Sequence, residues 1–296
     1  MIKFNEKNYA KLCDDRVNNP SKIQKILKQR KKRSKLTKDG KLFIVAADHT
    51  ARGIISASGN SMAMADRYDL LERLIRSLEV PGVDGILATP DIVEELAYFG
   101  AIHNKVVFGS INRAGILGMD WEMDDRESSY DVKGITEFGL DGGKTLLRIE
   151  KSDPGVVNTI EMVAKVNSQL ARAKKVSIIE PLPYVKNSAG KFELNNDVTE
   201  LARVIGIASA LGTTSAYTWL KVPAFEDFAY AAKSTTLPLM LLGGDPGKDW
   251  EKTFDKWRQA FKFANVRALI PGRTLDRKST RLNSSHVKRS RMPSSA

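Results

Sequence analysis

Eight short runs of apolar, often β-branched residues recur along the chain between residues 42 and 271. Runs of this kind, bounded by polar or turn-forming residues, are typical of β-strands that are buried on both faces. The candidate strands are Leu42–Asp48, Val83–Thr89, Val106–Asn112, Thr145–Glu150, Val176–Pro181, Ser215–Val222, Leu237–Gly243 and Val266–Pro271.

Amphipathic segments with helical periodicity separate most of these strands. The candidate helices are Tyr68–Leu78, Asp91–Phe99, Val156–Ala173, Asp197–Leu211 and Phe225–Ser234. Strands that alternate with helices form βαβ units, in which the strands run parallel. Eight such units in about 230 residues predict an α/β fold, a closed (β/α)8 TIM barrel over residues 41–275. An open, doubly wound sheet is the alternative, although no Gly-x-Gly-x-x-Gly follows the first strand.

Both ends of the chain differ from this body. Residues 1–40 predict a basic helical N-terminal extension, whose basic run 28–33 we interpret as solvated or as an oligomer contact. The runs 276–286 and 290–296 resemble a common sequencing adapter translated in two reading frames. We therefore expect residues 276–296 to be foreign and disordered, the natural sequence to stop near Leu275, and helix 8 of the barrel to be missing.

The net charge of +12 lies almost wholly at these ends, because residues 1–40 carry +9 and residues 276–296 carry +5. The near-neutral body argues against a nucleic-acid partner, with binding through the basic arm kept as an alternative. Cys13 is the only cysteine, which favours a reducing, cytoplasmic location. No run of about 18 apolar residues predicts a membrane span.

The sixth candidate strand ends in a lysine. Period-two alternation places Tyr217, Trp219 and Lys221 on one face of this strand. Burial beside aromatic rings disfavours the ammonium form, and a neutral amine can attack a carbonyl carbon. Lys221 is therefore the candidate nucleophile, and a lysine that snorkels to the barrel rim is the alternative.

Two acids and a tyrosine are candidates for proton transfer, because catalytic groups lie at the C-terminal ends of barrel strands. Asp48 follows the first apolar run, Glu180 interrupts the fifth, and Tyr184 lies in the loop that we expect after it. Each of these groups can exchange a proton with a substrate or an amine. The structural alternatives are a capping role for Asp48 and pairing of Glu180 with Lys144 or Arg148.

The fourth candidate strand carries charges on one face. Alternation places Lys144, Arg148 and Glu150 opposite the apolar Leu147 and Ile149, so the charges should point into the barrel. Charged side chains are rarely buried unless they are paired, so an ion-pair network is one interpretation. The other is that Arg148 binds a substrate oxygen.

Glycines follow the last two candidate strands. Glycine lets backbone N–H groups approach an anion, and the loops after strands seven and eight of such barrels often bind phosphate. An arginine in the second loop adds a bidentate donor. The expected phosphate-binding residues are Gly243, Gly244, Gly272 and Arg273.

No metal or cofactor is predicted. His49, His103 and Cys13 are the only histidines and cysteine before residue 276, and they share no ligand-like spacing. This scarcity favours amine catalysis over zinc, whereas a magnesium site built from oxygens alone is left open. His49, which follows Asp48, is a further candidate residue of the catalytic site, with a hydrogen bond within its loop as the structural alternative.

In their order along the chain, these motifs resemble those of the class I (Schiff-base) aldolases. The resemblance rests on Ala-x-Asp-His after the first strand, a lysine ending the sixth, Gly-Gly after the seventh and Gly-Arg after the eighth. The resemblance covers residues 40–275 of this chain. The superfamily that it indicates includes fructose-bisphosphate, tagatose-bisphosphate and deoxyribose-phosphate aldolases. The resemblance is strongest to the aldolase-like barrels of inositol-catabolism clusters. It implies that Lys221 forms the Schiff base and that Asp48 is the strand-one acid.

The resemblance also implies a lyase that cleaves or forms a carbon–carbon bond in a phosphorylated sugar or sugar acid. The segment Glu180–Tyr184 departs from the fructose-bisphosphate pattern around the catalytic tyrosine, which implies a different substrate and leaves the proton-transfer residue open. A homo-oligomer is expected by analogy. The alternative enzyme is a metal-independent phosphosugar isomerase or epimerase that uses carboxylates alone.

Overall fold

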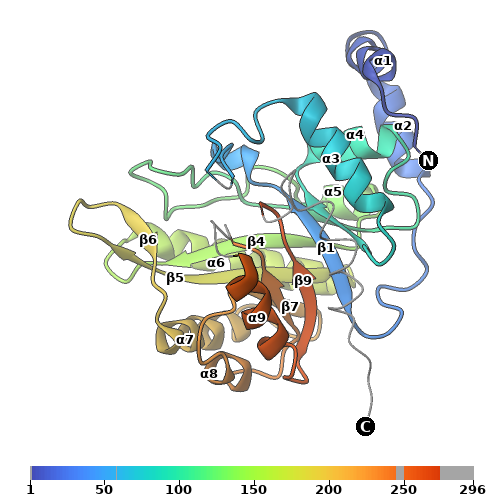
Figure 1. Ribbon diagram of the computed structural model, residues 1–296. Helices are drawn as coiled ribbons and strands as arrows, with labels where there is room; N and C mark the ends of the chain where they lie inside the picture. The colour runs from blue at the N-terminus through green and yellow to red at the C-terminus, as the bar shows by residue number, and fades with distance from the viewer. Residues whose placement is uncertain (1, 58, 245–249, 274–296) are drawn as a thin grey trace.

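Eight parallel strands form a closed barrel in the computed structural model, which describes residues 2–57, 59–244 and 250–273 (Figure 1). The strand order is β4-β3-β2-β1-β9-β8-β7-β5, and pairing of β4 with β5 closes the ring. The strands are β1 (Leu42–Ala47), β2 (Gly85–Ala88), β3 (Val106–Ser110), β4 (Gly142–Ile149), β5 (Val176–Lys186), β7 (Thr218–Val222), β8 (Leu239–Leu242) and β9 (Val266–Ile270). The predicted (β/α)8 TIM barrel is confirmed, and an open sheet is excluded.

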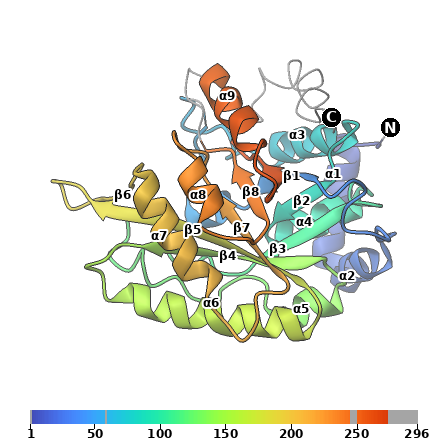
Figure 2. The ribbon, with the colours of Figure 1, turned by 90° about the horizontal axis from the view of Figure 1, so that it is seen from below.

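Helices connect successive barrel strands and lie outside the ring (Figure 2). They are α3 (Arg67–Glu79), α4 (Pro90–Tyr98), α5 (Val132–Glu137), α6 (Gly155–Arg172), α7 (Val198–Ser209), α8 (Ala229–Lys233) and α9 (Trp250–Ala260). The five predicted helices are all present, whereas α5 and α9 were not predicted. A six-residue helix such as α5 is too short to display a helical period.

Alternation along each strand separates two kinds of core. Ile44 of β1 points into the barrel, where it packs with Phe108 of β3 and Met240 of β8. Val45, the next residue along β1, faces outward and packs against Leu71 of α3. Strands buried on both faces read as continuous apolar runs, which is why the sequence revealed all eight of them.

Strand β5 is longer than predicted. Beyond Pro181 it continues to Lys186 and pairs in antiparallel register with β6 (Phe192–Leu194). Tyr184 therefore lies on a strand, opposite Leu194, and the expectation that it belongs to a loop is wrong. This hairpin projects beyond the barrel (Figure 1).

The N-terminal extension forms α1 (Glu6–Asn18) and α2 (Pro20–Gln29), which lie beside α3 and α4 (Figure 1). The Arg30 guanidinium donates hydrogen bonds to the carbonyl oxygens of Phe138 and Gly139, and Arg33 pairs with Asp84 at 2.9 Å. Arg30 is therefore buried and the Arg33 side chain is only 9% exposed, so the expectation of a solvated basic run is wrong for these two arginines. The expected foreign tail 276–296 and the helix after β9 lie outside the described residues.

Candidate functional site

Two lysines from different strands meet one carboxylate inside the barrel. The Lys221 Nζ lies 2.7 Å from Oε1 of Glu180, and the Lys144 Nζ lies 2.5 Å from Oε2 of the same side chain. Strand register explains the meeting, because Ile179 of β5 pairs with Leu220 of β7 and the next residue on each strand is Glu180 or Lys221. All three side chains are at most 8% exposed, so water screens these charges little.

Asp48 extends this cluster toward β1 and β3. Its Oδ2 accepts a hydrogen bond from the Ser110 hydroxyl at 2.9 Å and lies 3.0 Å from Nη1 of Arg113. The same oxygen lies 3.3 Å from the Lys144 Nζ. Lys144 therefore bridges Asp48 and Glu180, and a chain of ion pairs runs from Arg113 to Lys221. We refer to Asp48, Arg113, Lys144, Glu180 and Lys221 as the barrel cluster.

The barrel cluster holds both carboxylates ionised. Burial raises the pKa of Glu180, but Lys144 and Lys221 together outweigh it and lower that pKa to about 2. Burial likewise opposes ionisation of Asp48, yet Arg113, Lys144 and Lys221 hold its pKa well below the ordinary value. Burial, followed by the charge of Arg113, lowers the pKa of Lys144 to about 8, against the opposing effect of the two acids. Lys144 can therefore give up or accept a proton near neutral pH.

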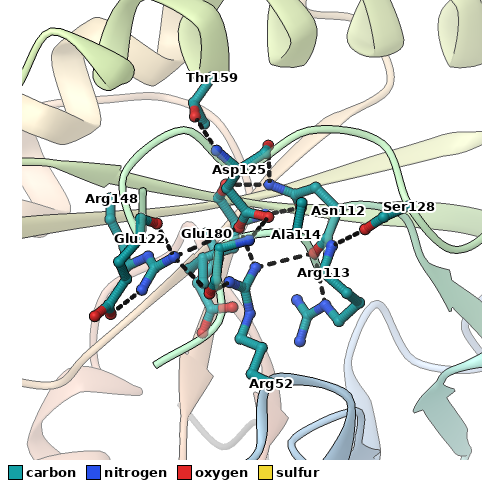
Figure 3. Close-up of polar contacts among 12 residues, drawn as sticks. Arg52, Asn112, Arg113, Ala114, Glu122, Asp125, Ser128, Arg148, Thr159 and Glu180 are labelled. Carbon is teal, nitrogen blue, oxygen red and sulfur yellow. Dashed lines mark hydrogen bonds and ion pairs between the residues drawn. The ribbon is translucent and has the colours of Figure 1, made fainter. Parts of the chain in front are cut away.

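Arg148 belongs to a second network of polar contacts, which Figure 3 draws together with Arg113 and Glu180. Its Nη1 donates to a carboxylate oxygen of Glu122, and its Nη2 donates to the Gly115 carbonyl oxygen at 3.0 Å. Arg52 donates to the same carbonyl oxygen and to the carboxylate of Asp125. These bonds fix the loop between β3 and α5. Arg148 is therefore paired with an acid, as the ion-pair interpretation of its strand expects.

Tyr184 lies beside this network rather than beside Lys221. The Arg148 Cζ lies 5.8 Å from the centre of the Tyr184 ring, a cation–π contact. Burial is the largest of the effects that raise the pKa of the Tyr184 hydroxyl, so the phenol stays protonated at neutral pH. The structure therefore brings together Lys221, Glu180 and Asp48 through Lys144, and it groups Tyr184 with Arg148 next to them.

The residues expected to bind phosphate lie at the ends of β8 and β9. Gly243 and Gly244 directly follow β8, and Gly272 and Arg273 follow β9. A pocket between β1 and α3 is lined by Gly272 and Arg273 together with His49. Burial lowers the pKa of His49 to about 4, with Asp48 as the main opposing charge, so this imidazole is neutral at neutral pH.

Three residues of the site were missed or passed over at the sequence level. Lys144 appeared only as a charge on its strand, and Ser110 and Arg113 were not considered. The sequence did contain an indication of the last two, because polar residues end β3 and follow it directly, namely Ser110, Asn112 and Arg113. The contacts of Ser110 and Arg113 with Asp48 could not be deduced without the barrel register.

Within the described residues, no group of three or more histidine, cysteine, aspartate or glutamate side chains could hold a metal ion. Over the same part of the chain, no helix is long and apolar enough to cross a membrane.

Solved structures with the same fold include several aldolases. An archaeal fructose 1,6-bisphosphate aldolase is 17% identical, with a TM-score of 0.63 over 90% of this chain and 98% of its own. A fructose-bisphosphate aldolase from Slackia heliotrinireducens is 14% identical, with a TM-score of 0.60 over 84% of this chain and 79% of its own. At these identities the similarity establishes the shared fold.

A more similar structure is that of Cgl0159 from Corynebacterium glutamicum. It is 39% identical and superposes with a TM-score of 0.92 over 97% of both chains. No curated protein matches the sequence. The model of the Cgl0159-like family matches residues 40–281, which include the whole barrel and every residue of the barrel cluster. The chain belongs to the Cgl0159-like family.

Proposed function

We propose that this protein is a class I aldolase that cleaves or forms a carbon–carbon bond in a phosphorylated sugar or sugar acid, with Lys221 as the Schiff-base amine. The observation that carries the proposal is the contact of Lys221 with Glu180, which is shared with Lys144 inside the barrel. An amine at the C-terminal end of a barrel strand, beside groups that can exchange its proton, is the arrangement that amine catalysis needs. The aldolase fold of the structural relatives agrees with it.

The lysine pair supplies a route for the first proton. Glu180 forms an ion pair with each lysine, so a proton leaving Lys221 passes through the carboxylate to neutral Lys144. The neutral Lys221 nitrogen then adds to the substrate carbonyl carbon as the carbonyl π bond breaks, and one proton of that nitrogen passes to the carbonyl oxygen, which becomes a hydroxyl. Loss of that hydroxyl as water, with a proton returned by Lys144, leaves an iminium cation.

The iminium accepts the electron pair of the carbon–carbon bond that breaks. The hydroxyl on the departing carbon loses its proton as that carbon becomes an aldehyde, and the remaining fragment becomes an enamine on Lys221. Asp48 and Glu180 are the candidate acceptors for this proton, and Tyr184, whose phenol is protonated, is the candidate donor of the proton that the enamine carbon takes up. Hydrolysis of the resulting iminium releases the second product and restores Lys221.

Arg148 and the phosphate loops have positioning roles in this scheme. Arg148 holds the loop at Gly115 and the ring of Tyr184 in place beside the reacting groups. Gly243, Gly244, Gly272 and Arg273 bind the substrate phosphate, which fixes the carbonyl relative to Lys221. Binding energy from this remote group then contributes to orientation.

Borohydride trapping tests the proposal. The protein is incubated with dihydroxyacetone phosphate, reduced with sodium borohydride, and weighed as an intact chain. We expect the mass of one reduced adduct on the wild type and on Lys233→Met, which replaces an exposed lysine of α8, and none on Lys221→Met. Absence of an adduct on folded wild type with this and other phosphorylated carbonyl compounds would contradict the proposal and favour the isomerase.

A further inference from the structure

The side chain of Asn112 takes the place of strand backbone beside β4. The last backbone hydrogen bond between β3 and β4 runs from the Ile111 N–H to the Lys144 carbonyl oxygen at 2.9 Å. One step further along β4, the Asn112 Oδ1 accepts from the Leu146 N–H and its Nδ2 donates to the Leu146 carbonyl oxygen, each at 2.7 Å. In a continuous parallel ladder, the Ile111 carbonyl oxygen and the Arg113 N–H would bind these two groups. The Asn112 amide therefore replaces both of them.

The two backbone groups that Asn112 replaces have other partners. The Ile111 carbonyl oxygen accepts from the N–H groups of Ser128 and Ser129, at 3.1 and 3.0 Å. The Arg113 N–H donates to the Ser128 hydroxyl at 2.7 Å (Figure 3). Because buried backbone groups need hydrogen-bond partners, this exchange lets the chain leave the sheet directly after Ile111.

The early end of the ladder changes the face on which Arg113 lies. Along β3, Ser110 points into the barrel and donates to Asp48, whereas Ile111 belongs to the apolar core between strands and helices. If the strand continued, alternation would place Arg113 on the outer face, together with Ile111. Instead, the Arg113 Nη1 lies 3.0 Å from Oδ2 of Asp48. Asn112 thus gives Arg113 its place in the barrel cluster.

Arg113 shares one carboxylate oxygen with Lys144. The Oδ2 atom of Asp48 lies 3.0 Å from the Arg113 Nη1 and 3.3 Å from the Lys144 Nζ. Two cations on one oxygen repel each other, so the guanidinium disfavours the ammonium form of the lysine. After burial, Arg113 is accordingly the largest of the effects that lower the pKa of Lys144. The charged groups that act on Lys144 are Arg113 and Lys221, which lower its pKa, and Asp48 and Glu180, which raise it.

We infer that Asn112 is a positioning residue: by ending the ladder between β3 and β4 it brings Arg113 onto the oxygen of Asp48 that Lys144 contacts, and so favours the neutral amine of Lys144. The inference rests on the proposed function, in which neutral Lys144 accepts the proton of Lys221. It assigns a role to a residue that touches neither the substrate nor either amine.

A titration without substrate tests the effect on Lys144. The full chain is labelled with ¹³C at the lysine Cε atoms, and the Lys144 signal is identified by its loss in Lys144→Met. We expect Lys144 of the wild type to titrate with a pKa of about 8. Asn112→Leu, which removes both hydrogen-bonding groups at similar volume, and Arg113→Met should each lower the acid dissociation constant of the Lys144 ammonium about tenfold. These results in a protein that forms no borohydride adduct would contradict the proposed function and leave the inference intact.

Asn167→Leu is the matched control, because Asn167 of α6 is also a buried amide. Its Nδ2 donates to the Leu211 carbonyl oxygen at 2.7 Å, and its Oδ1 accepts from the hydroxyl of Thr218, the first residue of β7, at 3.0 Å. We expect this variant to lose stability while Lys144 titrates as in the wild type. An unchanged titration in folded Asn112→Leu, or an equal shift in Asn167→Leu, would overturn the inference.

Two wild-type measurements decide the matter even if Asn112→Leu does not fold. Scalar coupling across a hydrogen bond should connect the Leu146 amide nitrogen to the side-chain Cγ of Asn112. Coupling to the Ile111 carbonyl carbon instead would show a continuous ladder and overturn the inference. Titration of wild-type Lys144 at the ordinary pKa of 10.5 would overturn it as well.

Discussion

Glu180 and Lys221 face each other on adjacent strands of the barrel, with Oε1 and Nζ 2.7 Å apart and both side chains at most 8% exposed. The other oxygen of Glu180 holds Lys144. One carboxylate thus pairs with two buried lysines from the neighbouring strands β4 and β7.

Replacing Glu180 with glutamine keeps the side-chain volume and removes the charge. We expect Glu180→Gln to lower the free energy of unfolding by about 3–5 kcal/mol, because it leaves two buried lysines without their shared partner. The rate of adduct formation should fall by about 10²- to 10⁴-fold, the usual effect of losing a proton-transfer group. Denaturant unfolding and timed borohydride trapping measure the two effects.

Glu200→Gln is the control for this change. Glu200 pairs with Lys151 at the protein surface, where an ion pair contributes about 0–1 kcal/mol. We expect this variant to unfold and to form adduct like the wild type. If Glu180→Gln did the same, the shared carboxylate would have no role in the site.

The rate of adduct formation should depend on the protonation of Lys144. Its pKa of about 8 lies below the ordinary 10.5, so the neutral form that can accept the proton of Lys221 predominates only above about pH 8. We expect the rate to rise with pH through about 8, and Lys144→Met to be slower and to lack this rise. A pH profile of the initial trapping rate measures this dependence. An unchanged profile in Lys144→Met would refute proton transfer from Lys221 to Lys144.

The lowered pKa of Lys144 also affects the stability of the fold. Between about pH 8 and 10.5 the unfolded chain binds a proton at Lys144 that the folded chain has lost, so this group makes unfolding less favourable as pH rises over that range.

Gly272 allows the loop after β9 to pass close to His49. A methyl group at this position would lie 2.3 Å from Cε1 of His49 and 2.9 Å from the carbonyl oxygen of Ala46. We expect Gly272→Ala to lower the free energy of unfolding by about 1–3 kcal/mol, the usual cost of overpacking. It should also weaken binding of inorganic phosphate, because the loop must move away from the pocket.

Gly206 of α7 provides the matched control, because nothing lies within 4 Å of an added methyl group there. Gly206→Ala should raise stability by up to about 1 kcal/mol, as expected for alanine in a helix. Its phosphate affinity should equal that of the wild type. Thermal unfolding and calorimetric titration with phosphate compare the two variants, and equal behaviour would remove the argument for close packing at Gly272.

The barrel could be predicted from the sequence because its strands are covered on both sides. Continuous apolar runs such as those of β1 and β3 need no knowledge of their neighbours to be recognised. The hairpin of β5 and β6 was not predicted, because Phe192–Leu194 is too short and too exposed to show a strand pattern. What stabilises it is pairing with Tyr184–Lys186 across the short turn 187–191, a contact that the side-chain pattern of Phe192–Leu194 does not indicate.

The site could be predicted only as far as single strands allow. Lys221, Glu180 and Asp48 are conspicuous because each is a charge that ends or interrupts an apolar run. Their joining through Lys144 depends on the register between β4, β5 and β7, which determines which side chains share a layer of the barrel. Arg113 was missed because its place in the site depends on its contact with Asp48, which the sequence does not indicate without the barrel register.

Peptide mapping of the trapped adduct tests the central claim most directly. After reaction with dihydroxyacetone phosphate and borohydride, the protein is digested and the modified lysine is identified by tandem mass spectrometry. We predict modification of Lys221 and an unmodified Lys144, both in the wild type and in Lys233→Met. Modification of Lys144 instead, or of surface lysines in proportion to their exposure, would contradict Lys221 as the Schiff-base amine.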